Sequence, residues 1–357
     1  ESMFINKVYL ENFRNYEKQE IEFSEKANVI YGLNGQGKTN IVEALYFFCR
    51  GKSYRTPRDA DVIKFGEKYS RFSIDFNDDV RDSNAEIYIG EKKNIKINFV
   101  PIEKLSELVG MINTVIFTPD MLGVVKDGPG VRRQFADVLL SQIKPVYFRT
   151  LLMYCKVLFQ RNNILKSGKK NMLATLPVWN EKLAEYGTLI CSYRVRLTEM
   201  LTEHTSKFDC GGEDERILFD YRPSIRGDFA DRENFISQLE ANIDREIEKG
   251  ITLTGPHRDD IEIMFGGRDL KKFGSQGQIR TCILKMKLAE CDIIRESVGR
   301  EPILLLDDIL SELDADRRDF FLNNIKDRQI FITSTEKEII RDSNTGYFHV
   351  ECGKIVE

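Results

Sequence analysis

The sequence predicts an α/β fold, in which a lobe of mixed sheet and helices is interrupted by a mostly helical second lobe. Three observations support this prediction. A glycine-rich segment, Gly32–Thr39, lies between a short apolar strand and an amphipathic helix. Apolar residues in the middle of the chain, over about residues 128–249, recur mostly with helical spacing. An apolar strand that ends in two acids, Ile303–Asp308, follows far downstream, and we expect the two flanks to fold together.

The first flank begins with strands and one helix. Apolar and polar residues alternate from Phe4 to Leu10 and again over Gln19–Phe23, which predicts two strands. Ala27–Tyr31 is a short buried strand that runs into the glycines, and Thr39–Cys49 has the apolar spacing of a helix. Turn-forming Asn, Asp and Gly residues separate three further predicted strands: Arg71–Phe76, Ala85–Ile89 and Ile95–Phe99.

Helical spacing dominates the middle of the chain. It predicts helices at Val131–Ile143, Val146–Lys166, Val178–Phe208 and near Asn234–Glu248, with one strand at Ile217–Tyr221. Strands return in the last flank, at Ile251–Thr254, Ile261–Phe265, Pro302–Asp307 and Gln329–Thr333, with helices after Ser275 and near Asp316–Ile325. We therefore divide the chain into residues 3–127 and 250–357, the two halves of one lobe, and residues 128–249, the insertion.

Composition favours a soluble globular protein of the cytoplasm. Of the 357 residues, 41% are hydrophobic and 31% are charged, and the net charge is −4. We expect no membrane span, because no stretch approaches the ~18 apolar residues that a span needs, and we expect no signal peptide. Seven cysteines without a C-x-x-C pair, together with only three histidines, do not match zinc-site spacing, and we expect reduced thiols.

Basic residues gather in three places, although the chain as a whole is acidic. A nucleic-acid-binding protein can concentrate lysines and arginines on one face whatever its net charge, so the acidic sum does not exclude DNA. Taken alone, each cluster is more typical of an ordinary solvated surface. The clusters are Lys52, Arg55 and Arg58; Lys166, Lys169 and Lys170; and Arg194 and Arg196.

The glycine-rich segment matches the phosphate-binding pattern G-x-x-x-x-G-K-[ST] in full. Its glycines let backbone N–H groups turn toward a phosphate, and the start of the helix adds a favourable dipole. Lys38 is placed to reach the β- and γ-phosphates of ATP, and the Thr39 hydroxyl is placed to ligate Mg²⁺. We assign nucleotide binding to Gly32, Leu33, Asn34, Gly35, Gln36, Gly37, Lys38, Thr39 and Asn40.

The downstream strand contributes Asp307 and Asp308. A buried strand that ends in acids is common at the tip of any parallel sheet, so this segment alone is a weak signal. Paired with a phosphate-binding loop, Asp307 becomes the natural Mg²⁺ ligand, and Asp308 becomes the candidate general base for the attacking water. We therefore assign catalysis to Lys38, Asp307 and Asp308, and metal binding to Thr39 and Asp307.

A second segment of interest, Ser275-Gln276-Gly277-Gln278, precedes a long amphipathic helix. Serine is a good N-cap residue, so the segment can be an ordinary helix start. It can also be a second anion-binding helix N-terminus that faces the γ-phosphate. Since the first loop already cradles the phosphates from one side, a second copy of the chain is the natural source of this segment.

The segment Gly255–Asp260 is polar and rich in turn-forming residues, and its His257 and Arg258 invite a catalytic interpretation. The structural alternative is a turn between two strands, in which Arg258 pairs with Asp259 or Asp260.

These segments occur in the order found in ABC-type P-loop ATPases: a P-loop, an S-x-G-Q segment, an apolar strand ending in acids, and Ser311-Glu312-Leu313-Asp314 just after it. The chain also resembles the RecF family, in the SMC-like branch of these ATPases, from Met3 to the C-terminal strands. Four local segments carry this similarity: Asn12–Tyr16, Lys52–Thr56, Gly255–Asp260 and Gly274–Gln278.

The resemblance implies roles that spacing alone does not give. RecF-like proteins bind ATP between two subunits arranged head to tail, so Ser275–Gln278 of one chain would close on ATP held by the other. Ser311–Asp314 matches the loop that lines this dimer contact, and Thr335 lies about where many relatives carry a switch histidine. The resemblance adds six residues to the nucleotide-binding set: Arg14, Asn15, Ser275, Gln276, Gly277 and Gln278.

Three positions depart from the general ABC pattern. Gln276 replaces the middle glycine of S-G-G-Q, Asp308 stands where most members have glutamate, and Thr335 is not histidine. In addition, we identify no glutamine loop. These departures predict slow hydrolysis, typical of a switch rather than of a fast motor. The resemblance implies that this ATPase is DNA-dependent.

The function that the resemblance implies is ATP-dependent DNA binding in recombinational repair and replication-fork maintenance. ATP would drive a homodimer that clamps duplex or gapped DNA, and hydrolysis would release it. The implied partners are RecR with RecO, and indirectly the recombinase RecA, at the nucleoid. The alternative is an ABC ATPase subunit that serves a transporter or a nuclease. A transporter subunit usually carries S-G-G-Q and a switch histidine, and a nuclease needs a further acidic metal cluster.

Overall fold

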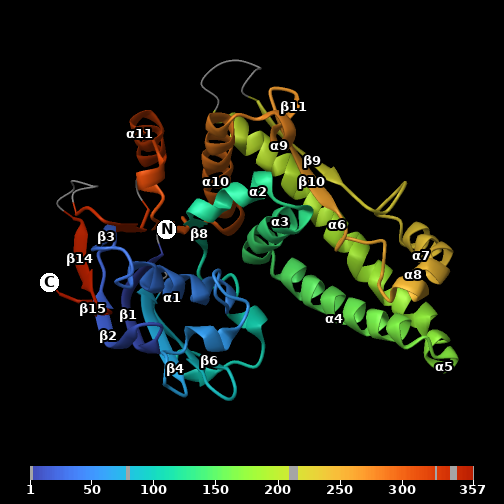
Figure 1. The fold of residues 1–357 in the computed structure, drawn as a ribbon, viewed down its shortest axis with the longest axis horizontal. Helices are drawn as coiled ribbons and strands as arrows, with labels where there is room; N and C mark the ends of the chain where they lie inside the picture. The colour runs from blue at the N-terminus through green and yellow to red at the C-terminus, as the bar shows by residue number, and fades with distance from the viewer. Residues whose placement is uncertain (1–2, 78–80, 209–215, 326–327, 338–343, 357) are drawn as a thin grey trace. The chain divides into compact units, whose positions relative to one another are not determined.

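The computed structural model of the chain describes residues 3–77, 81–208, 216–325, 328–337 and 344–356. The chain divides into two compact units: unit 1 comprises Glu1–Met121 and Glu290–Glu357, and unit 2 comprises Leu122–Ala289 (Figure 1). Unit 1 contains two large sheets with helices, and unit 2 is mostly helical, so the predicted α/β class is confirmed.

The helical unit extends further along the chain than the insertion predicted at 128–249. Residues 250–289 group with unit 2 because strand β10 (Asp260–Phe265) pairs along its whole length with β9 (Ile217–Arg222), an antiparallel partner inside the insertion. The boundary between the units consequently falls within helix α10 (Gln276–Val298) rather than at residue 249.

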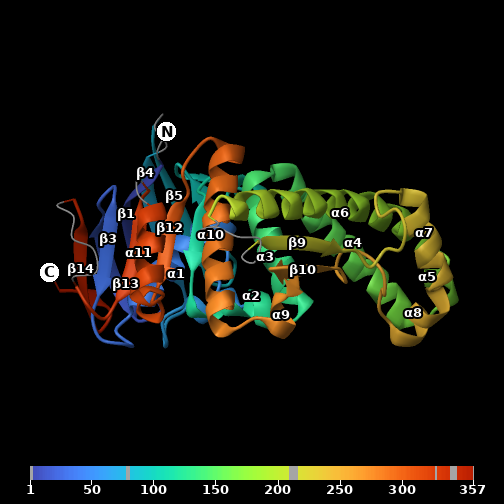
Figure 2. The same cartoon turned by 90° about the horizontal axis from the view of Figure 1, so that it is seen from above.

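A six-stranded mixed sheet in unit 1 brings together the strand ends that matter for the predicted site. Its order is β15-β14-β3-β13-β12-β8, and all neighbours are parallel except the β14–β15 pair (Figure 2). Asp307 pairs in register with Thr333, and Thr333 with Ile30, so three carboxyl ends meet at one edge. The strands are β3 (Ala27–Tyr31), β8 (Thr114–Phe117), β12 (Ile303–Asp307), β13 (Ile330–Ser334), β14 (Gly346–Glu351) and β15 (Lys354–Ile355).

The second sheet of unit 1 is antiparallel, with the order β2-β1-β4-β5-β6-β7. Buried residues alternate with less buried ones along its strands, because one face packs on the core and the other faces solvent. The strands are β1 (Phe4–Phe13), β2 (Tyr16–Glu22), β4 (Ser70–Asn77), β5 (Asp82–Ile89), β6 (Asn94–Ile97) and β7 (Val100–Pro101).

Helix α1 (Lys38–Arg50) lies in the hydrophobic core of unit 1. Its Leu45 belongs to one cluster with Phe72 of the antiparallel sheet and Leu305 of the mixed sheet. Residues 41–49 are all buried, as expected of a helix that is covered on every side. This packing fixes the start of α1 next to the edge where the parallel strands end.

Short helical segments complete unit 1. Asp314 caps the last of them, because its side chain accepts a 3.0 Å hydrogen bond from the backbone N–H of Arg317. The segments are η1 (Asp59–Val62), η2 (Leu105–Glu107), η5 (Leu310–Glu312) and α11 (Ala315–Asn324).

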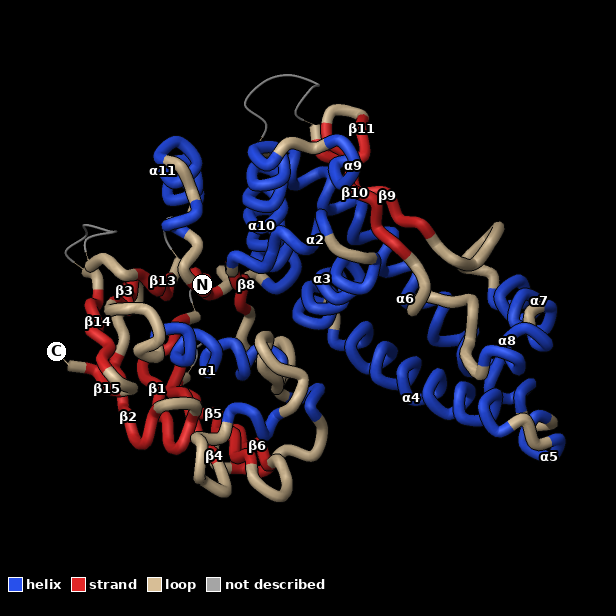
Figure 3. The backbone as a smooth tube through the Cα atoms, viewed as in Figure 1, coloured by secondary structure: helices blue, strands red, loops and turns tan. Residues whose placement is uncertain are grey.

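Unit 2 is built on two long helices, α4 (Pro145–Ser167) and α6 (Leu176–Ser206), which pack along each other (Figure 3). Arg161 and Glu246 form a fully buried ion pair at 2.7 Å in this unit. The remaining elements are α2 (Gly123–Lys126), α3 (Pro129–Ile143), α5 (Lys170–Leu173), α7 (Arg232–Ala241), α8 (Ile243–Lys249), β11 (Arg268–Asp269) and α9 (Leu270–Phe273).

Two local predictions in unit 2 are wrong. Residues 251–254 form no strand, because the Thr252 carbonyl accepts hydrogen bonds from the side chains of His257 and Arg258 instead of a neighbouring strand. The single helix predicted near Asn234–Glu248 is two helices, which the chain separates at Asn242.

Two further findings concern the whole of the described chain. None of its helices combines the length and the apolar character that crossing a membrane requires. The described cysteines are free thiols, and Cys210 lies outside the described residues.

Candidate functional site

The glycine-rich loop runs from the end of β3 into α1, as the pattern predicted. Gly37 is the N-cap of α1, with φ 118°, and a Cβ atom there would lie 2.7 Å from the Asn15 side chain. Gly32 has φ 146°, and a Cβ atom there would lie 2.4 Å from the Val350 carbonyl oxygen. Both positions therefore require glycine. No side chain caps α1 at Gly37, and the first N–H groups of a helix have no partner within it.

The Lys38 ammonium points back over this loop. It donates hydrogen bonds to the carbonyl oxygens of Gly32, at 2.8 Å, and Leu33, at 3.0 Å. Burial lowers the pKa of Lys38, whereas the carboxylates of Asp308 and Asp307 act in the opposite direction. The ammonium is thus held inside the loop, where an anion would find a positive charge already in place.

The Asp307 carboxylate accepts hydrogen bonds from three hydroxyl groups, which come from three separate segments of the chain. Oδ1 accepts from Thr39 at 2.8 Å and from Thr333 at 2.9 Å, and Oδ2 accepts from the Tyr54 hydroxyl at 2.9 Å. Burial, with the neighbouring Asp307 charge second, raises the pKa of Tyr54 far above its usual value, so the phenol stays protonated and donates. The predicted metal-binding pair, Thr39 and Asp307, is therefore brought together.

Asp308 has the left-handed backbone conformation that is uncommon outside glycine, with φ 52°. Its backbone N–H donates to the Thr333 hydroxyl at 2.9 Å. Burial and the charge of Asp307 raise the pKa of Asp308, and the Lys38 charge opposes this rise. Asp308 lines a cavity of about 420 Å³ that Asn34 and Thr335 also line.

The turn between β1 and β2 is tied to the loop through Asn15, which donates to the Gln36 carbonyl at 2.8 Å and accepts from Asn40 at 2.8 Å. Arg14 of the same turn forms a bidentate pair with Glu43, a fully buried residue of α1, at 2.6 and 2.9 Å. The structure therefore brings together all the site residues that were predicted in unit 1.

Sequence reasoning missed three contributors to this arrangement: Tyr54, Thr333 and Glu43. Tyr54 lies within a segment that resembled the family, but nothing in its spacing assigns a partner to its hydroxyl. Thr333 follows from topology, because β13 is the immediate neighbour of β12 and pairs with it at Asp307. Glu43 gives a readable signal, since a carboxylate in an otherwise apolar helix needs a charged partner when it is buried.

The residues present fit a magnesium nucleotide. A helix start without a side-chain cap leaves N–H groups for an anion, and a lysine is aimed into the loop. The hydroxyl and carboxylate oxygens of Thr39 and Asp307 are the ligand types that Mg²⁺ prefers. This fit rests on the donor set of unit 1 alone.

The predicted second anion site lies in unit 2 and forms a capping box. The backbone N–H of Gln278 donates to the Ser275 hydroxyl at 3.2 Å, and the backbone N–H of Ser275 donates to the Gln278 side chain at 2.9 Å. Lys126 donates to the Gln276 side chain at 3.1 Å. The capping interpretation of this segment is correct, and its exposure to solvent leaves it accessible to a partner.

The segment Gly255–Asp260 is a structural turn, but its predicted ion pair is wrong. Arg258 donates to the Thr252 carbonyl, at 3.2 Å, and not to Asp259 or Asp260. Asp260 pairs with Arg132, at 2.7 Å. His257 is held by Tyr154 and Thr252, and burial lowers its pKa to about 4, so it is neutral near pH 7.

One of the basic clusters is only partly on the surface, because Arg196 is exposed and Arg194 is not. Arg194 is almost fully buried, where it pairs with Asp137 at 2.8 Å and donates to the Pro256 carbonyl at 2.6 Å. Arg194 therefore holds the interior of unit 2 together and is not available to DNA. Lys166, Lys169 and Lys170, by contrast, are exposed.

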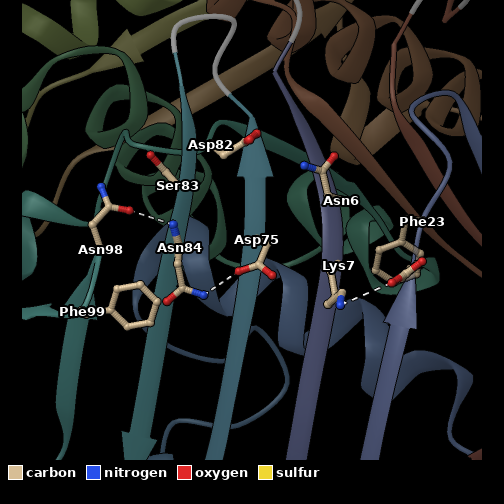
Figure 4. Close-up of a pocket in the computed structure, with 10 residues that line it drawn as sticks. Asn6, Lys7, Phe23, Asp75, Asp82, Ser83, Asn84, Asn98 and Phe99 are labelled. Carbon is tan, nitrogen blue, oxygen red and sulfur yellow. Dashed lines mark hydrogen bonds and ion pairs between the residues drawn. The ribbon is translucent and has the colours of Figure 1, made fainter.

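A separate cavity, of about 600 Å³, lies over strands of the antiparallel sheet (Figure 4). Its polar side chains pair with one another: Asn84 donates to Asp75 at 2.6 Å, and Lys7 pairs with Glu22 at 3.3 Å. None of the predicted site residues lines it. This cavity therefore contributes nothing to the candidate chemistry predicted from the sequence.

Comparison with known proteins agrees with this geometry. The family model for the RecF/RecN/SMC N-terminal domain matches residues 4–354. The DNA replication and repair protein RecF of Acetivibrio thermocellus is 42% identical over 370 residues, which cover 99% of each chain. RecF of Ruminiclostridium cellulolyticum is 41% identical over 369 residues, again covering 99% of each chain.

Solved structures give the same answer. The structure of the recombination mediator protein RecF with ATP superposes with a TM-score of 0.92 and 35% identity, over 99% of this chain and 97% of that one. An Smc head domain from Pyrococcus furiosus shares the fold alone, with a TM-score of 0.53 and 19% identity, over 99% of this chain and 96% of that one. The chain therefore belongs to the RecF family, within the RecF/RecN/SMC group, and has the mixed α/β fold of its ABC-type ATPase heads.

Proposed function

We propose that this chain is an ATP-dependent DNA-binding protein of recombinational DNA repair and replication-fork maintenance. The observation that carries the proposal is the contact between Thr39 and Asp307. It joins the glycine-rich loop and the acid-ended strand β12 into one site. Support comes from relatives named for DNA replication and repair, and from a solved relative described as a recombination mediator with ATP in the RecFOR pathway.

Within the site, each residue has a proposed task. The loop N–H groups and Lys38 hold the phosphates, Thr39 and Asp307 hold Mg²⁺, and Arg14 and Asn15 border the nucleotide from the β1–β2 turn. Bound Mg²⁺ supplies charge neutralisation of the phosphates. Asp308 accepts a proton from the attacking water, a task that its raised pKa favours.

Two copies of the chain complete the site in this proposal. The exposed segment Ser275–Gln278 of one copy faces the γ-phosphate held by the other, and the exposed Ser311 and Asp314 lie at the same contact. ATP binding thereby drives dimerisation, and slow hydrolysis ends it. Because Asp308 is one methylene shorter than the usual glutamate, the reaction is slow enough to act as a switch.

In this proposal the switch controls binding to duplex DNA near a gap or junction. Exposed lysines of unit 2, among them Lys166, Lys169 and Lys170, are the proposed contacts to phosphate, so binding is salt-sensitive and weakly sequence-specific. The proposed protein partners are RecR with RecO, which act with RecA on single strands at the nucleoid.

The test is fluorescence anisotropy on labelled gapped duplex DNA, with and without Mg·ATP. Tight binding that requires Mg·ATP in the parent and is lost in Lys38→Met supports the proposal. Equal binding in both conditions, or none in either, contradicts an ATP-gated DNA clamp. Repeating the titration at two salt concentrations separates phosphate contacts from base contacts, because only the former weaken steeply as salt rises.

A further inference from the structure

The carboxylate of Asp307 is held by more donors than the metal-binding pair requires. A carboxylate has two oxygens and about four acceptor positions. Thr39 and Thr333 take two positions on Oδ1, and the Tyr54 hydroxyl takes one on Oδ2. Because hydroxyls donate to both oxygens, rotation of the carboxylate group is restricted. One acceptor position remains on Oδ2 for a further ligand.

Tyr54 reaches Asp307 from a segment that is itself fixed. Ser53 donates to the buried carboxylate of Glu43 at 2.5 Å, and its oxygen accepts from the backbone N–H groups of Arg55, at 2.9 Å, and Thr56, at 3.2 Å. The residue before the tyrosine therefore anchors the backbone of the turn to α1, which fixes the position from which the Tyr54 side chain extends.

Packing fixes the ring as well. The Tyr54 ring meets the buried Tyr46 ring edge to face, with centroids 5.3 Å apart. Tyr46 lies on α1, whose start carries the phosphate-binding loop. The same helix thus positions the loop and the hydroxyl that holds Asp307.

We propose that Tyr54 is a positioning residue, which orients Asp307 so that its free lone pair faces the Mg²⁺ of the bound nucleotide. This inference rests on the proposed ATPase function and adds a residue to it. Groups that hydrogen-bond to metal ligands commonly change metal affinity by about 10–100-fold when removed. Loss of one hydroxyl among three belongs at the lower end of that range.

The experiment measures metal binding and not turnover. Mn²⁺ replaces Mg²⁺ as an electron-paramagnetic-resonance probe, and it is titrated into protein saturated with a non-hydrolysable ATP analogue. We expect Tyr54→Phe to weaken Mn²⁺ binding about tenfold, while the affinity for the nucleotide in EDTA stays within about twofold. Tyr54→Met also removes the hydroxyl, with a smaller and unbranched side chain, and gives a second reading of the same quantity.

Tyr46→Phe is the matched control. It removes a buried hydroxyl from the partner ring, whereas the hydroxyl that donates to Asp307 is that of Tyr54. Mn²⁺ affinity should stay at the parental value in this variant. Unchanged Mn²⁺ affinity in Tyr54→Phe and Tyr54→Met, or an equal loss in Tyr46→Phe, would overturn the inference.

Thr39→Val separates this inference from the proposed function. If Thr39→Val weakens Mn²⁺ binding and the Tyr54 variants do not, Tyr54 has no positioning role and the ATP site stands. If Thr39→Val also leaves Mn²⁺ binding unchanged, the phosphate-binding loop is not the metal site and the proposed function itself fails.

Discussion

The Thr39 hydroxyl donates a 2.8 Å hydrogen bond to Asp307, a residue that lies 268 positions further along the chain. Parallel pairing makes this possible, because β12 and β3 both flank β13 and end at the same edge of the sheet. Unit 2 separates the two residues in sequence without separating them in space. The pairing of the parallel strands therefore assembles the site. Mutations in the chain segments before and after the insertion should both affect binding of the same nucleotide.

The first prediction concerns the lysine of the loop. Lys38→Met should weaken ATP binding by at least about 100-fold, because each hydrogen bond from a charged donor contributes roughly 1.5–3 kcal/mol and the ammonium makes more than one. The measurement is titration with a fluorescent ATP analogue. Lys64→Met, which removes a lysine outside the site that faces Glu17 at 3.8 Å, should bind the analogue as the parent does. An unchanged affinity in Lys38→Met would falsify the loop assignment.

The second prediction concerns the candidate general base. Asp308→Asn should keep ATP binding within about threefold and slow hydrolysis by roughly 100-fold or more, the usual contribution of a positioned acid–base group. Asparagine tolerates the left-handed backbone that residue 308 adopts, so the fold should persist. Single-turnover hydrolysis gives the rate. Asp319→Asn, an exposed acid on α11, is the matched control. If Asp308→Asn hydrolyses at the parental rate, another group accepts the proton.

Local patterns predicted the loop, the strand with its acids and the cap at Ser275, because each depends on neighbours in sequence. They did not predict the hydroxyl of Tyr54 on Asp307, since only the register of distant strands and the turn after α1 bring the two together. The buried state of Arg194 was missed for a related reason. Its partner Asp137 lies on another helix, and charge alone does not reveal which side of α6 faces inward.

The boundary of the helical unit could not be predicted either, because it depends on which distant strands pair. Alternation over Ile261–Phe265 correctly predicted a strand, but alternation does not name a partner strand. Pairing of that strand with β9 transfers residues 250–289 to unit 2. If the first flank had carried an alternating strand like β9, the strand Ile261–Phe265 could have paired there instead. Residues 250–289 would then have grouped with unit 1.

The third prediction concerns the proposed contact between two copies. Ser275→Arg should leave ATP binding by the single chain within about twofold and abolish ATP-induced dimerisation, because the added side chain fills the space meant for a phosphate. Sedimentation velocity with and without Mg·ATP gives the oligomeric state. A normal ATP-dependent dimer in Ser275→Arg would refute the proposed contact.

A control is needed because Ser275 also caps α10. Loss of the cap alone should cost about 1 kcal/mol of unfolding free energy. Ser275→Ala loses the same cap without adding bulk, so thermal unfolding of the two variants should match. If Ser275→Ala fails to dimerise as completely as Ser275→Arg, the hydroxyl or the cap is what dimerisation requires, and the steric argument is wrong.

The fourth prediction concerns the pH dependence of stability. The Thr252 carbonyl can only accept, so Nε2 of His257 donates to it, and Nδ1 accepts from the Tyr154 hydroxyl. Burial lowers the pKa of this imidazole to about 4, against 6.5 for the free side chain. Between these values the unfolded chain binds the extra proton and the folded chain does not, so stability falls as pH drops, by up to about 3 kcal/mol at pH 4. Urea unfolding at several pH values checks this: His257→Asn should be less stable than the parent at pH 7, and the difference should shrink steadily toward pH 4. A difference that stays constant with pH would show that His257 does not titrate as its burial requires.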